Sequence, residues 1–191
     1  MAEDTAAERG AQDRALADLH EDIWQRLARG VRDRRAASRH PVLATVGRAG
    51  GAEARVLVLR GASRANATLK LHTDSASGKV AELRAEPRAC LLVWDAAARL
   101  QIRLRGRVEV RPGDAAEWRR VPEGARAAYG GTPPGAPLAA PEEVDATPDP
   151  ARFTVLTARL EEIEALHLGQ PHHRRARFRA DEGWAGRWIA P

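Results

Sequence analysis

The sequence predicts a mainly β fold (α+β) in which short antiparallel strands form a barrel or a sandwich. Two observations predict it. Short segments rich in Val, Leu and Ile recur between turns that contain Gly or Pro, whereas helical periodicity is limited to a few segments. Residues 99–110 alternate strictly between apolar and polar side chains, which is the pattern of a half-buried antiparallel strand. An alternating βαβ sheet is therefore not favoured.

The N-terminal segment is expected to be an amphipathic helix at residues 11–36. Apolar side chains recur there at three- and four-residue steps among charged ones: Leu16, Leu19, Ile23, Leu27 and Val31. Pro41 follows and helps to end the helix. We expect residues 1–38 to form this helical segment and residues 39–191 to form one globular domain.

Strands are expected where apolar, β-branched segments are bounded by turn residues. These segments are 42–46, 55–60, 68–73, 88–94, 99–110 and 153–166, with a last short strand near Trp188. Residues 47–51 would form a hairpin turn, and short helices are expected at 77–85 and 114–121. Residues 130–150 are rich in Gly and Pro and too long for a simple connection, so they should form a lid or an interface arm.

Size and composition describe one domain without a membrane span. The chain has 191 residues, 43% of them hydrophobic, which is enough for one sizeable core. No apolar run reaches the roughly 18–20 residues that cross a bilayer, and the acidic N-terminus lacks the features of a signal peptide. The single cysteine, Cys90, excludes a disulfide framework and is expected to be a buried thiol. A cytoplasmic protein fits best.

The net charge of +5 raises the question of nucleic-acid binding. Lysine occurs only at Lys70 and Lys79, so the basic charge is almost entirely arginine, and acidic residues are interspersed along most of the chain. This pattern indicates a compositional bias rather than a clustered phosphate-binding surface. We expect no nucleic-acid partner, and a steeply salt-dependent affinity for DNA or RNA would contradict this.

Common catalytic motifs are absent from the sequence, which has no P-loop, no Gly-x-Ser-x-Gly elbow and no Cys-x-x-Cys pair. The adjacent residues His172 and His173 could ligate a metal. They lack supporting ligands and are flanked by arginines, so a solvated basic segment is the better interpretation. No metal site is expected.

Residues 71–79 offer a phosphate site. This segment leads from a strand into a helix N-terminus, where unpaired N–H groups and the positive end of the helix dipole attract anions. Thr73, Ser75 and Ser77 add hydroxyl donors, and Lys79 adds a full charge. An ordinary helix N-cap at Ser75 or Ser77 would explain the same residues.

The strand expected at 55–60 strengthens the case for anion binding. Alternation places Arg55 on one face of a regular strand and Arg60 on the other, so the two arginines would serve two different anions. The alternative is that both are strand-end charges that reach water.

Six segments, taken in order from residue 39 to residue 191, are similar to motifs of one known family. Arg55-Val-Leu-Val-Leu-Arg60 is similar to its Arg-x-Val-Leu-Leu-Lys strand, and Leu71-His72-Thr73 to its aromatic residue followed by Thr. Ser77-Gly78-Lys79 resembles its Ser-Arg-Lys, and Glu86-Pro87-Arg88-Ala-Cys-Leu-Leu its Asn-Pro-Arg-x-x-Leu-Leu. Residues 99–106 resemble its flavin-contacting Gln strand, and its C-terminal motif resembles Arg177-Phe178, Trp184 and Ile189-Ala190-Pro191. The chain thus resembles the split-barrel proteins that bind flavin mononucleotide (FMN), typified by pyridoxamine 5'-phosphate oxidase.

The resemblance implies an antiparallel six-stranded split β-barrel that binds FMN near the interface of a homodimer. The residues that it implies for the FMN phosphate are Arg55, Ser77 and Lys79. Those that would line the flavin are the backbone of Val56, Leu57 and Val58, together with His72 and Thr73. Gln101 would bind the polar edge of the ring, and Arg177 would close the site. The substrate-binding residues would be Arg60, His173 and Arg175.

The chain departs from the family pattern at three places. Gly78 replaces an arginine that helps to hold the phosphate, and His167 replaces a Trp that packs on the flavin. The family's Arg-x-His, which grips the pyridoxal substrate, is exchanged here into His173 and Arg175, and alternation would still point both to one side of a strand. FMN binding is expected to survive these changes, whereas the family's substrate is not.

The resulting hypothesis is an FMN-dependent oxidoreductase acting on a small-molecule substrate, an anionic one being a candidate. The alternative is a non-catalytic flavin- or haem-binding split-barrel module, because one fold hosts several functions. The two differ in whether the bound flavin is reduced by NAD(P)H or a substrate amine and then reoxidised.

Overall fold

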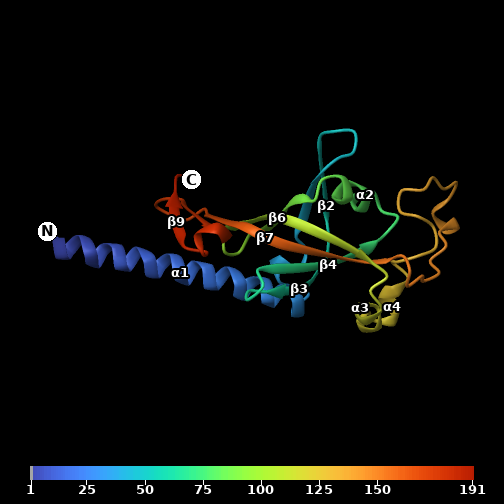
Figure 1. Ribbon diagram of the computed structural model, residues 1–191, viewed down its shortest axis with the longest axis horizontal. Helices are drawn as coiled ribbons and strands as arrows, with labels where there is room; N and C mark the ends of the chain where they lie inside the picture. Colours follow the sequence, from blue (N-terminus) through green and yellow to red (C-terminus); the bar gives the residue numbers. More distant parts are fainter. Residues whose placement is uncertain (1) are drawn as a thin grey trace.

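The computed structural model describes the backbone of residues 2–191 and the side chains of residues 10–191. In this part of the chain, nine strands form one antiparallel sheet, and the long helix α1 (Ala2–Arg32) lies along it (Figure 1). The strands are β1 (Val42–Val46), β2 (Ala52–Val56), β3 (Leu59–Ser63), β4 (Thr68–Asp74), β5 (Arg88–Asp95), β6 (Leu100–Pro112), β7 (Phe153–His167), β8 (Arg174–Arg179) and β9 (Gly186–Ile189). The shorter helices are α2 (Gly78–Ala85), α3 (Ala115–Arg120) and α4 (Glu123–Arg126).

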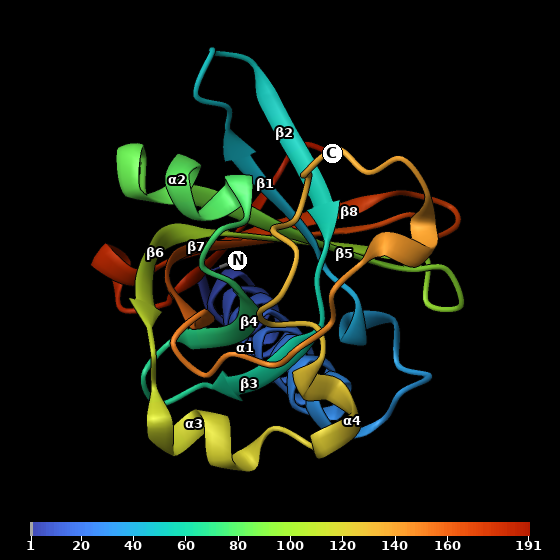
Figure 2. The same ribbon diagram turned by 90° about the vertical axis from the view of Figure 1, so that its right-hand side faces the viewer.

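The sheet topology confirms the predicted antiparallel split barrel, although the sheet in the described residues has nine strands rather than six. Neighbouring strands follow the order β2-β1-β5-β6-β7-β4-β3, and within residues 2–191 the two ends of this path do not pair, so the sheet stays open. The hairpin of β8 and β9 joins β7 outside this path. In Figure 2 α1 is seen nearly end-on, and α2 and α3 lie far apart at the top and bottom of the barrel.

The centre of the sheet is the pairing of its two longest strands, β6 with 13 residues and β7 with 15. They pair from Leu100 opposite His167 to Pro112 opposite Thr154. The alternation predicted for β6 is confirmed, because the side chains toward the core are buried at Leu100, Ile102, Leu104 and Val108. The register shifts once, between Arg105 and Gly106.

The other edge of β7 is divided between two strands. β4 pairs with residues 153–159 of β7, and β8 pairs with residues 162–167. Between them, the backbone N–H of Leu160 donates to the carbonyl of Ala67, in the turn before β4 (2.8 Å). This divided edge splits the barrel, because the β3–β4 hairpin pairs with one half of β7 and the β8–β9 hairpin pairs with the other half.

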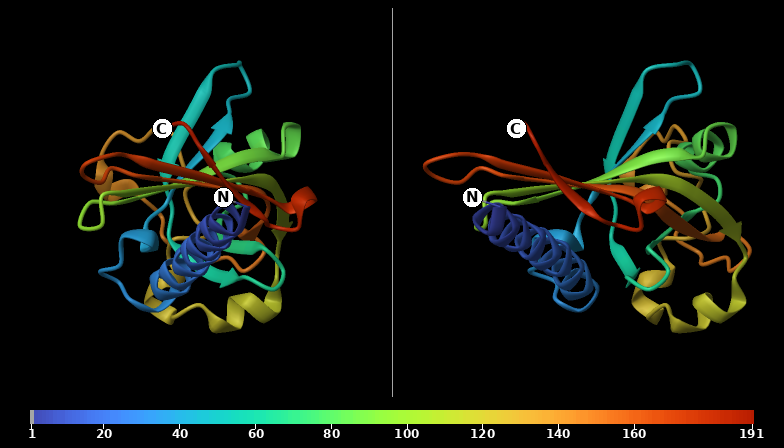
Figure 3. Two further views of the ribbon diagram at one scale, coloured as in Figure 1. Left: turned by 90° about the vertical axis from the view of Figure 1, so that its left-hand side faces the viewer. Right: turned by 60° about the vertical axis from the view of Figure 1, so that its left-hand side comes forward.

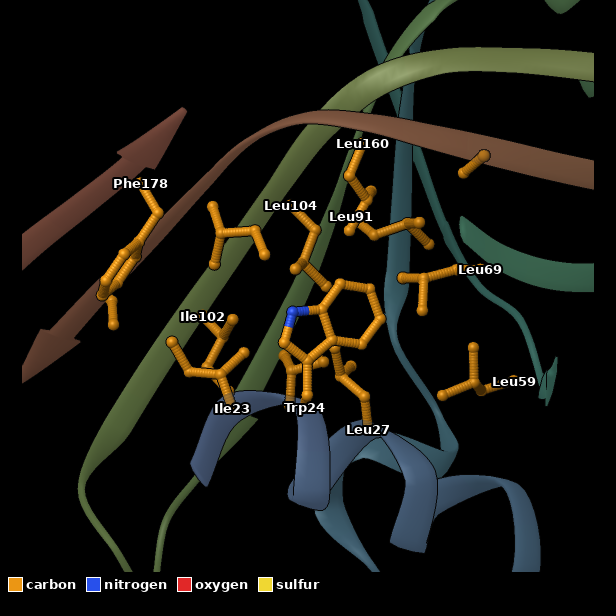
Figure 4. Close-up of a cluster of buried hydrophobic side chains, with 14 of the residues drawn as sticks. Ile23, Trp24, Leu27, Leu59, Leu69, Leu91, Ile102, Leu104, Leu160 and Phe178 are labelled. Carbon is orange, nitrogen blue, oxygen red and sulfur yellow. The ribbon is translucent and has the colours of Figure 1, made fainter. Parts of the chain in front are cut away.

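Helix α1 closes the core against the sheet. Its buried face contributes Ile23, Trp24 and Leu27 to the same hydrophobic cluster as the strand residues. Figure 4 shows the Trp24 indole between Leu104 and Leu27, and Figure 3 shows the helix crossing beneath the strands. The expected amphipathic helix is confirmed, although it ends at Arg32 rather than at residue 36. No helix in residues 2–191, α1 included, is long and apolar enough to cross a membrane.

The prediction of one regular strand at residues 55–60 is wrong. β2 ends at Val56 and β3 begins at Leu59, and between them the N–H of Leu57 donates to the carbonyl of Pro41 (3.0 Å). The reason lies in the topology, since β2 pairs with β1 at one end of the strand order and β3 pairs with β4 at the other. The chain must therefore turn a corner within a continuous apolar run.

One smaller expectation is also wrong. Cys90 is half-buried rather than buried, because Leu91 and Val93 face the core and alternation turns Cys90 to the opposite face of β5. The solvated interpretation of His172 and His173 is confirmed, since both are exposed. The basic residues that follow them form strand β8, in which Ala176 and Phe178 are buried between arginines.

Gly106 provides a test of the central pairing. A Cβ at this position would overlap the carbonyl of Arg159 and the Cα of Leu160 on β7, both of which are backbone atoms that cannot move aside. We expect Gly106→Ala to lower the free energy of unfolding by about 3 kcal/mol, measured by urea denaturation. Gly124→Ala on α4, where a Cβ meets nothing within 4 Å, is the matched control and should cost nothing. Equal stability of the two variants would contradict this account.

Candidate functional site

Four polar side chains converge where β4 leads into α2, and we call them the α2 cluster: Arg55, Thr73, Ser77 and Lys79. The Thr73 and Ser77 hydroxyls are 3.0 Å apart, and the Lys79 ammonium donates to the Thr73 hydroxyl at 3.2 Å. Thr73 and Ser77 are buried, and Arg55 and Lys79 are half-buried. The expected phosphate residues are therefore brought together in one place.

The electrostatics of the α2 cluster favour an anion. Burial, and then the repulsion of Arg55, lower the pKa of Lys79. The first turn of α2 contains no acidic residue, and its N-cap, Ser77, uses its hydroxyl for the carbonyl of Asp74 (2.7 Å) rather than for the helix. The N–H groups at this helix end thus keep their capacity to bind an anion.

Glu82 on α2 orients Arg55. Its carboxylate accepts from Nη2 of Arg55 at 2.8 Å and from the hydroxyl of Thr45 at 2.6 Å, and Arg55 also donates to Thr45. The Glu82 side chain is only 11% exposed, so this ion pair is shielded from solvent and its geometry matters. One side of the Arg55 guanidinium is held in this way.

Asp74 attaches the α2 cluster to the long loop at residues 130–150. This buried carboxylate accepts from the N–H of Gly130 at 2.9 Å and from Nε and Nη2 of Arg152 at 3.1 and 2.8 Å. Its other bond, from the N–H of Ala76 at 2.7 Å, shapes the turn into α2. The base of the loop is further joined by a bridge between Gly130 and Pro148.

A second group surrounds a cavity of about 280 Å³, which we call the Arg60 cavity. Its lining residues are Arg60, Lys70, His72, Glu117, Arg120, Val121 and Pro122. Glu117 accepts from Lys70 at 2.5 Å and from Arg120 at 3.3 Å. Two nitrogens, Nε of Arg60 and Nε2 of His72, are fully buried without a hydrogen-bond partner.

A third group lies on the face of β6, β7 and β8 opposite the core, and we call it the outer face. It contains Gln101, Arg103, Glu164, Arg175 and Arg177. Glu164 accepts from Arg175 at 2.8 Å and from Arg103 at 3.0 Å. Burial alone would raise the pKa of Glu164, but these two arginines outweigh it and lower the pKa. Nε of Arg175 and Nε of Arg177 are buried without partners.

The strand register separates the α2 cluster from the outer face. Arg55 lies opposite Leu43, and this row continues through Leu91, Leu104, Ile163 and Phe178, all of which are buried in the core. The next row, on the other face, runs from Val56 through Val42, Leu92, Arg103 and Glu164 to Arg177. The sheet therefore stands between Arg55 and Arg177 within one chain.

The comparisons with known proteins fit this arrangement. A family model described as pyridoxamine 5'-phosphate oxidase matches residues 28–167. The chain belongs to the pyridoxamine 5'-phosphate oxidase family. No curated protein sequence matches it significantly.

Three solved structures show how far the similarity to this family extends. A pyridoxamine 5'-phosphate oxidase-related, FMN-binding protein from Nostoc punctiforme is 25% identical over 90% of this chain and 96% of its own, with a TM-score of 0.75. PhzG from Burkholderia lata is 20% identical over 98% and 91% of the two chains, with a TM-score of 0.67. A protein related to general stress protein 26 from Clostridium acetobutylicum is 16% identical over 89% and 97%, with a TM-score of 0.56. The last two show the fold alone.

The residues that the pyridoxamine 5'-phosphate oxidase family implied fall into separate places. His72 and Thr73, expected together beside the flavin, lie on opposite faces of β4, with Thr73 in the α2 cluster and His72 in the Arg60 cavity. Val56, Leu57 and Val58 form the corner between β2 and β3. Gln101, Arg175 and Arg177 share the outer face.

Alternation predicted that His173 and Arg175 share one strand face, and this prediction is wrong. His173 is exposed and precedes β8, which begins at Arg174. Sequence reasoning also missed the acidic partners Glu82, Glu117 and Glu164. The only sequence pattern that pointed to these ion pairs was the alternation of glutamates with arginines, and a solvent-exposed charged surface has the same pattern.

The buried imidazole of His72 should make the protein sensitive to acid. Burial, and then the neighbouring Arg60, lower the pKa of His72 to about 4, whereas the unfolded chain keeps the ordinary value of 6.5. The unfolded state therefore binds the proton first, and stability is lost as the pH falls from about 6.5 to about 4, by about 3 kcal/mol at most.

Urea denaturation at pH 7.5, 5.5 and 4 would measure this loss. His72→Gln should remove this part of the pH dependence, and His172→Gln, at an exposed histidine, should retain the wild-type profile. An unchanged profile for His72→Gln would contradict the assignment.

Proposed function

We propose that this protein is an FMN-dependent oxidoreductase related to pyridoxamine 5'-phosphate oxidase, with an altered substrate pocket. The observation that supports it best is the α2 cluster. Arg55 and Lys79 repel each other at the start of α2, and Lys79 donates to the Thr73 hydroxyl. The nearby carboxylates of Glu82 and Asp74 are held by Arg55 and Arg152. An anion with several acceptor oxygens would relieve this repulsion.

The residues of the α2 cluster fit a terminal phosphate. Lys79 and Arg55 supply charge, and the Thr73 hydroxyl and the first N–H groups of α2 supply hydrogen-bond donors, whereas the Ser77 hydroxyl donates to the carbonyl of Asp74. The chain lacks a dinucleotide motif, which favours FMN over FAD. When bound, FMN would supply a two-electron acceptor. The chain would hold its phosphate, orient the ring and exclude water.

We also propose that the protein is a homodimer with FMN at the interface. Gln101 and Arg177, expected at the flavin, are separated from Arg55 by the sheet, so a site that contains all three needs two chains. The outer face continues onto β2 and β5, where two apolar side chains are exposed that a partner would cover. Val56 is 59% exposed and Trp94 is 48% exposed. The buried, unpartnered nitrogens of Arg175 and Arg177 lie on this face as well.

The substrate pocket would include Arg60 and, from the outer face, Arg175. Arg175 is bound to Glu164, which fixes its guanidinium, and His173 is exposed ahead of β8. The exchanged pair therefore does not present an imidazole beside an arginine on one strand. Such a pocket would position a different substrate over the flavin.

Removing the charges of the α2 cluster should weaken FMN binding. Each charge-assisted contact contributes about 1.5–3 kcal/mol, so Arg55→Ala with Lys79→Ala should raise the Kd for FMN at least about 100-fold. Riboflavin, which lacks the phosphate, should bind the variant and the wild type alike. Arg48→Ala, in the exposed β1–β2 turn, is the control. Fluorescence titration measures both ligands, and unchanged FMN affinity in the double variant would refute the site.

The dimer proposal is tested by light scattering at micromolar concentration with FMN bound. We expect twice the mass of the chain. Trp94→Glu introduces a charge on the outer face and should shift the mass to the monomer and weaken FMN binding. Trp188→Glu, at an exposed Trp whose paired residue Ala176 is buried on the core side, should leave the dimer intact. A monomer in the wild type would contradict the proposal.

The altered pocket predicts poor oxidation of pyridoxamine 5'-phosphate. A misplacement of about 1 Å can cost roughly 100-fold in rate, and the exchange at His173 and Arg175 changes reach, charge and donor pattern together. The measurement is formation of pyridoxal 5'-phosphate by FMN-loaded protein under oxygen. Turnover within tenfold of the median kcat of enzymes in general, about 10 s⁻¹, would show that the exchange does not impair this reaction. Bound flavin that no NAD(P)H or amine reduces would favour the non-catalytic alternative.

A further inference from the structure

The Arg60 cavity contains two buried nitrogens that have lost water and gained no partner. Nε of Arg60 and Nε2 of His72 are both fully buried without a hydrogen bond, and both residues line the cavity. The His72 side chain is only 9% exposed. Buried polar atoms are almost always hydrogen-bonded in native proteins, so two orphans in one cavity indicate an acceptor that belongs there.

His72 does not supply charge to this cavity. Its pKa of about 4 keeps the imidazole neutral at physiological pH, and Arg60 contributes to this by repelling the charged form. Its ring packs against Phe153 in a T-shaped arrangement, with ring centroids 4.8 Å apart, which restricts the orientation of the imidazole. The imidazole therefore offers one neutral hydrogen bond in a set direction.

Glu117 limits the positive charge available to a ligand. Its Oε1 accepts from Lys70 at 2.5 Å and from Arg120 at 3.3 Å, and its Oε2 lies 4.0 Å from Nε2 of His72. The side chain of Arg120 is 75% exposed, so water and salt screen its charge. Among the residues that line the cavity, the inner charges are then Arg60 and Lys70 against Glu117, which leaves a net charge of +1. Asp114, which acts on His72 from outside the lining, is paired with Arg111.

Helix α3 holds Glu117 in the cavity. The helix is capped by Asp114, whose side chain accepts from the N–H groups of Ala116 and Glu117. The next residue, Trp118, packs against Phe153 and carries the guanidinium of Arg126 over its ring at 5.2 Å. Glu117 therefore cannot easily withdraw when a second anion enters.

We propose that the Arg60 cavity binds the carboxylate of a small organic acid in preference to a phosphate ester, and that Glu117 sets this preference. A carboxylate carries one charge, matches the inner net charge and would accept from Nε of Arg60 and from Nε2 of His72 in its Nε2–H tautomer. A phosphate ester carries nearly two charges at neutral pH and would place the surplus beside Glu117. The inference that this acid is the substrate rests on the proposed flavin function, whereas the inference that the cavity binds a carboxylate does not depend on it.

The test compares benzoate with phenyl phosphate, two probes that share one ring and differ in their anionic group. Calorimetry at pH 8 uses FMN-saturated protein, in which the α2 cluster is occupied. It is repeated on flavin-free Arg55→Ala/Lys79→Ala protein, in which the α2 cluster cannot bind the phosphate probe. We expect the wild type to bind benzoate at least tenfold more tightly than phenyl phosphate. Arg60→Gln should lose benzoate binding.

Variants at Glu117 separate charge from fold. Glu117→Gln should shift the preference toward phenyl phosphate by tenfold or more, because the inner charge rises to +2. Lys70→Gln combined with Glu117→Gln restores the inner charge to +1 and should return the preference toward benzoate, even if α3 is loosened. Glu123→Gln, at an exposed acid on α4, should change nothing.

The inference is overturned if the wild type prefers phenyl phosphate, if neither probe binds, or if Glu117→Gln leaves the ratio unchanged. Its failure is distinguishable from failure of the flavin proposal. Benzoate binding to protein that does not bind FMN would support the cavity and reject the cofactor. FMN binding without benzoate binding would support the cofactor proposal and reject the carboxylate site in the Arg60 cavity.

Discussion

The pairing of β6 with β7 is the constraint on which the rest of the structure depends. These strands run side by side almost from end to end, and every other strand is attached to them directly or through one neighbour or two. The contact is so close at Gly106 that no side chain fits between this residue and the carbonyl of Arg159. A long run of backbone hydrogen bonds between the two strands fixes which side chains face the core and which face outward. A shift of the register by one residue would turn every core-facing side chain outward.

The divided edge of β7 follows from that constraint and determines where chemistry can occur. β4 uses one half of the edge and leads into α2, and β8 uses the other half and carries Arg175 and Arg177. Thr73 of β4 and the arginines Arg175 and Arg177 of β8 lie on different sides of the sheet. Each chain therefore has one part of the proposed flavin site facing away from the other part, and the sheet itself prevents them from meeting within a single subunit.

Much of this arrangement could be predicted from the sequence, because it depends on local patterns. Strict alternation defined β6 with its buried face, and the run from Thr73 to Lys79 placed hydroxyls and a cation at a helix start. The corner at Leu57 could not be predicted, since apolar residues continue through it and only pairing with distant strands forces the turn. Cys90 was misplaced for a related reason, because a run that is apolar on both faces does not show which residue faces the core.

The acidic residues of the site were hidden for a different physical reason. The partners that bury Glu82, Glu117 and Glu164 in the site, namely Arg55, Lys70, Arg103 and Arg175, lie 11 to 61 residues away along the chain, so no spacing rule connects them. The one local pair, Glu117 with Arg120, does not reveal the cavity. A glutamate among arginines looks the same in a sequence whether its side chain is exposed to solvent or buried in the folded protein. Burial decides the difference, and burial is a property of the assembled barrel.

Asp74 gives one of these enclosed carboxylates a mechanical role. One side chain holds the first residues of the turn into α2, the start of the loop at Gly130 and, through Arg152, the end of that loop. The loop is therefore hinged on the same atoms that support the α2 cluster. Any displacement of this loop would act first on Asp74, the last residue of β4, which lies next to Thr73 and supports the turn that carries Ser77.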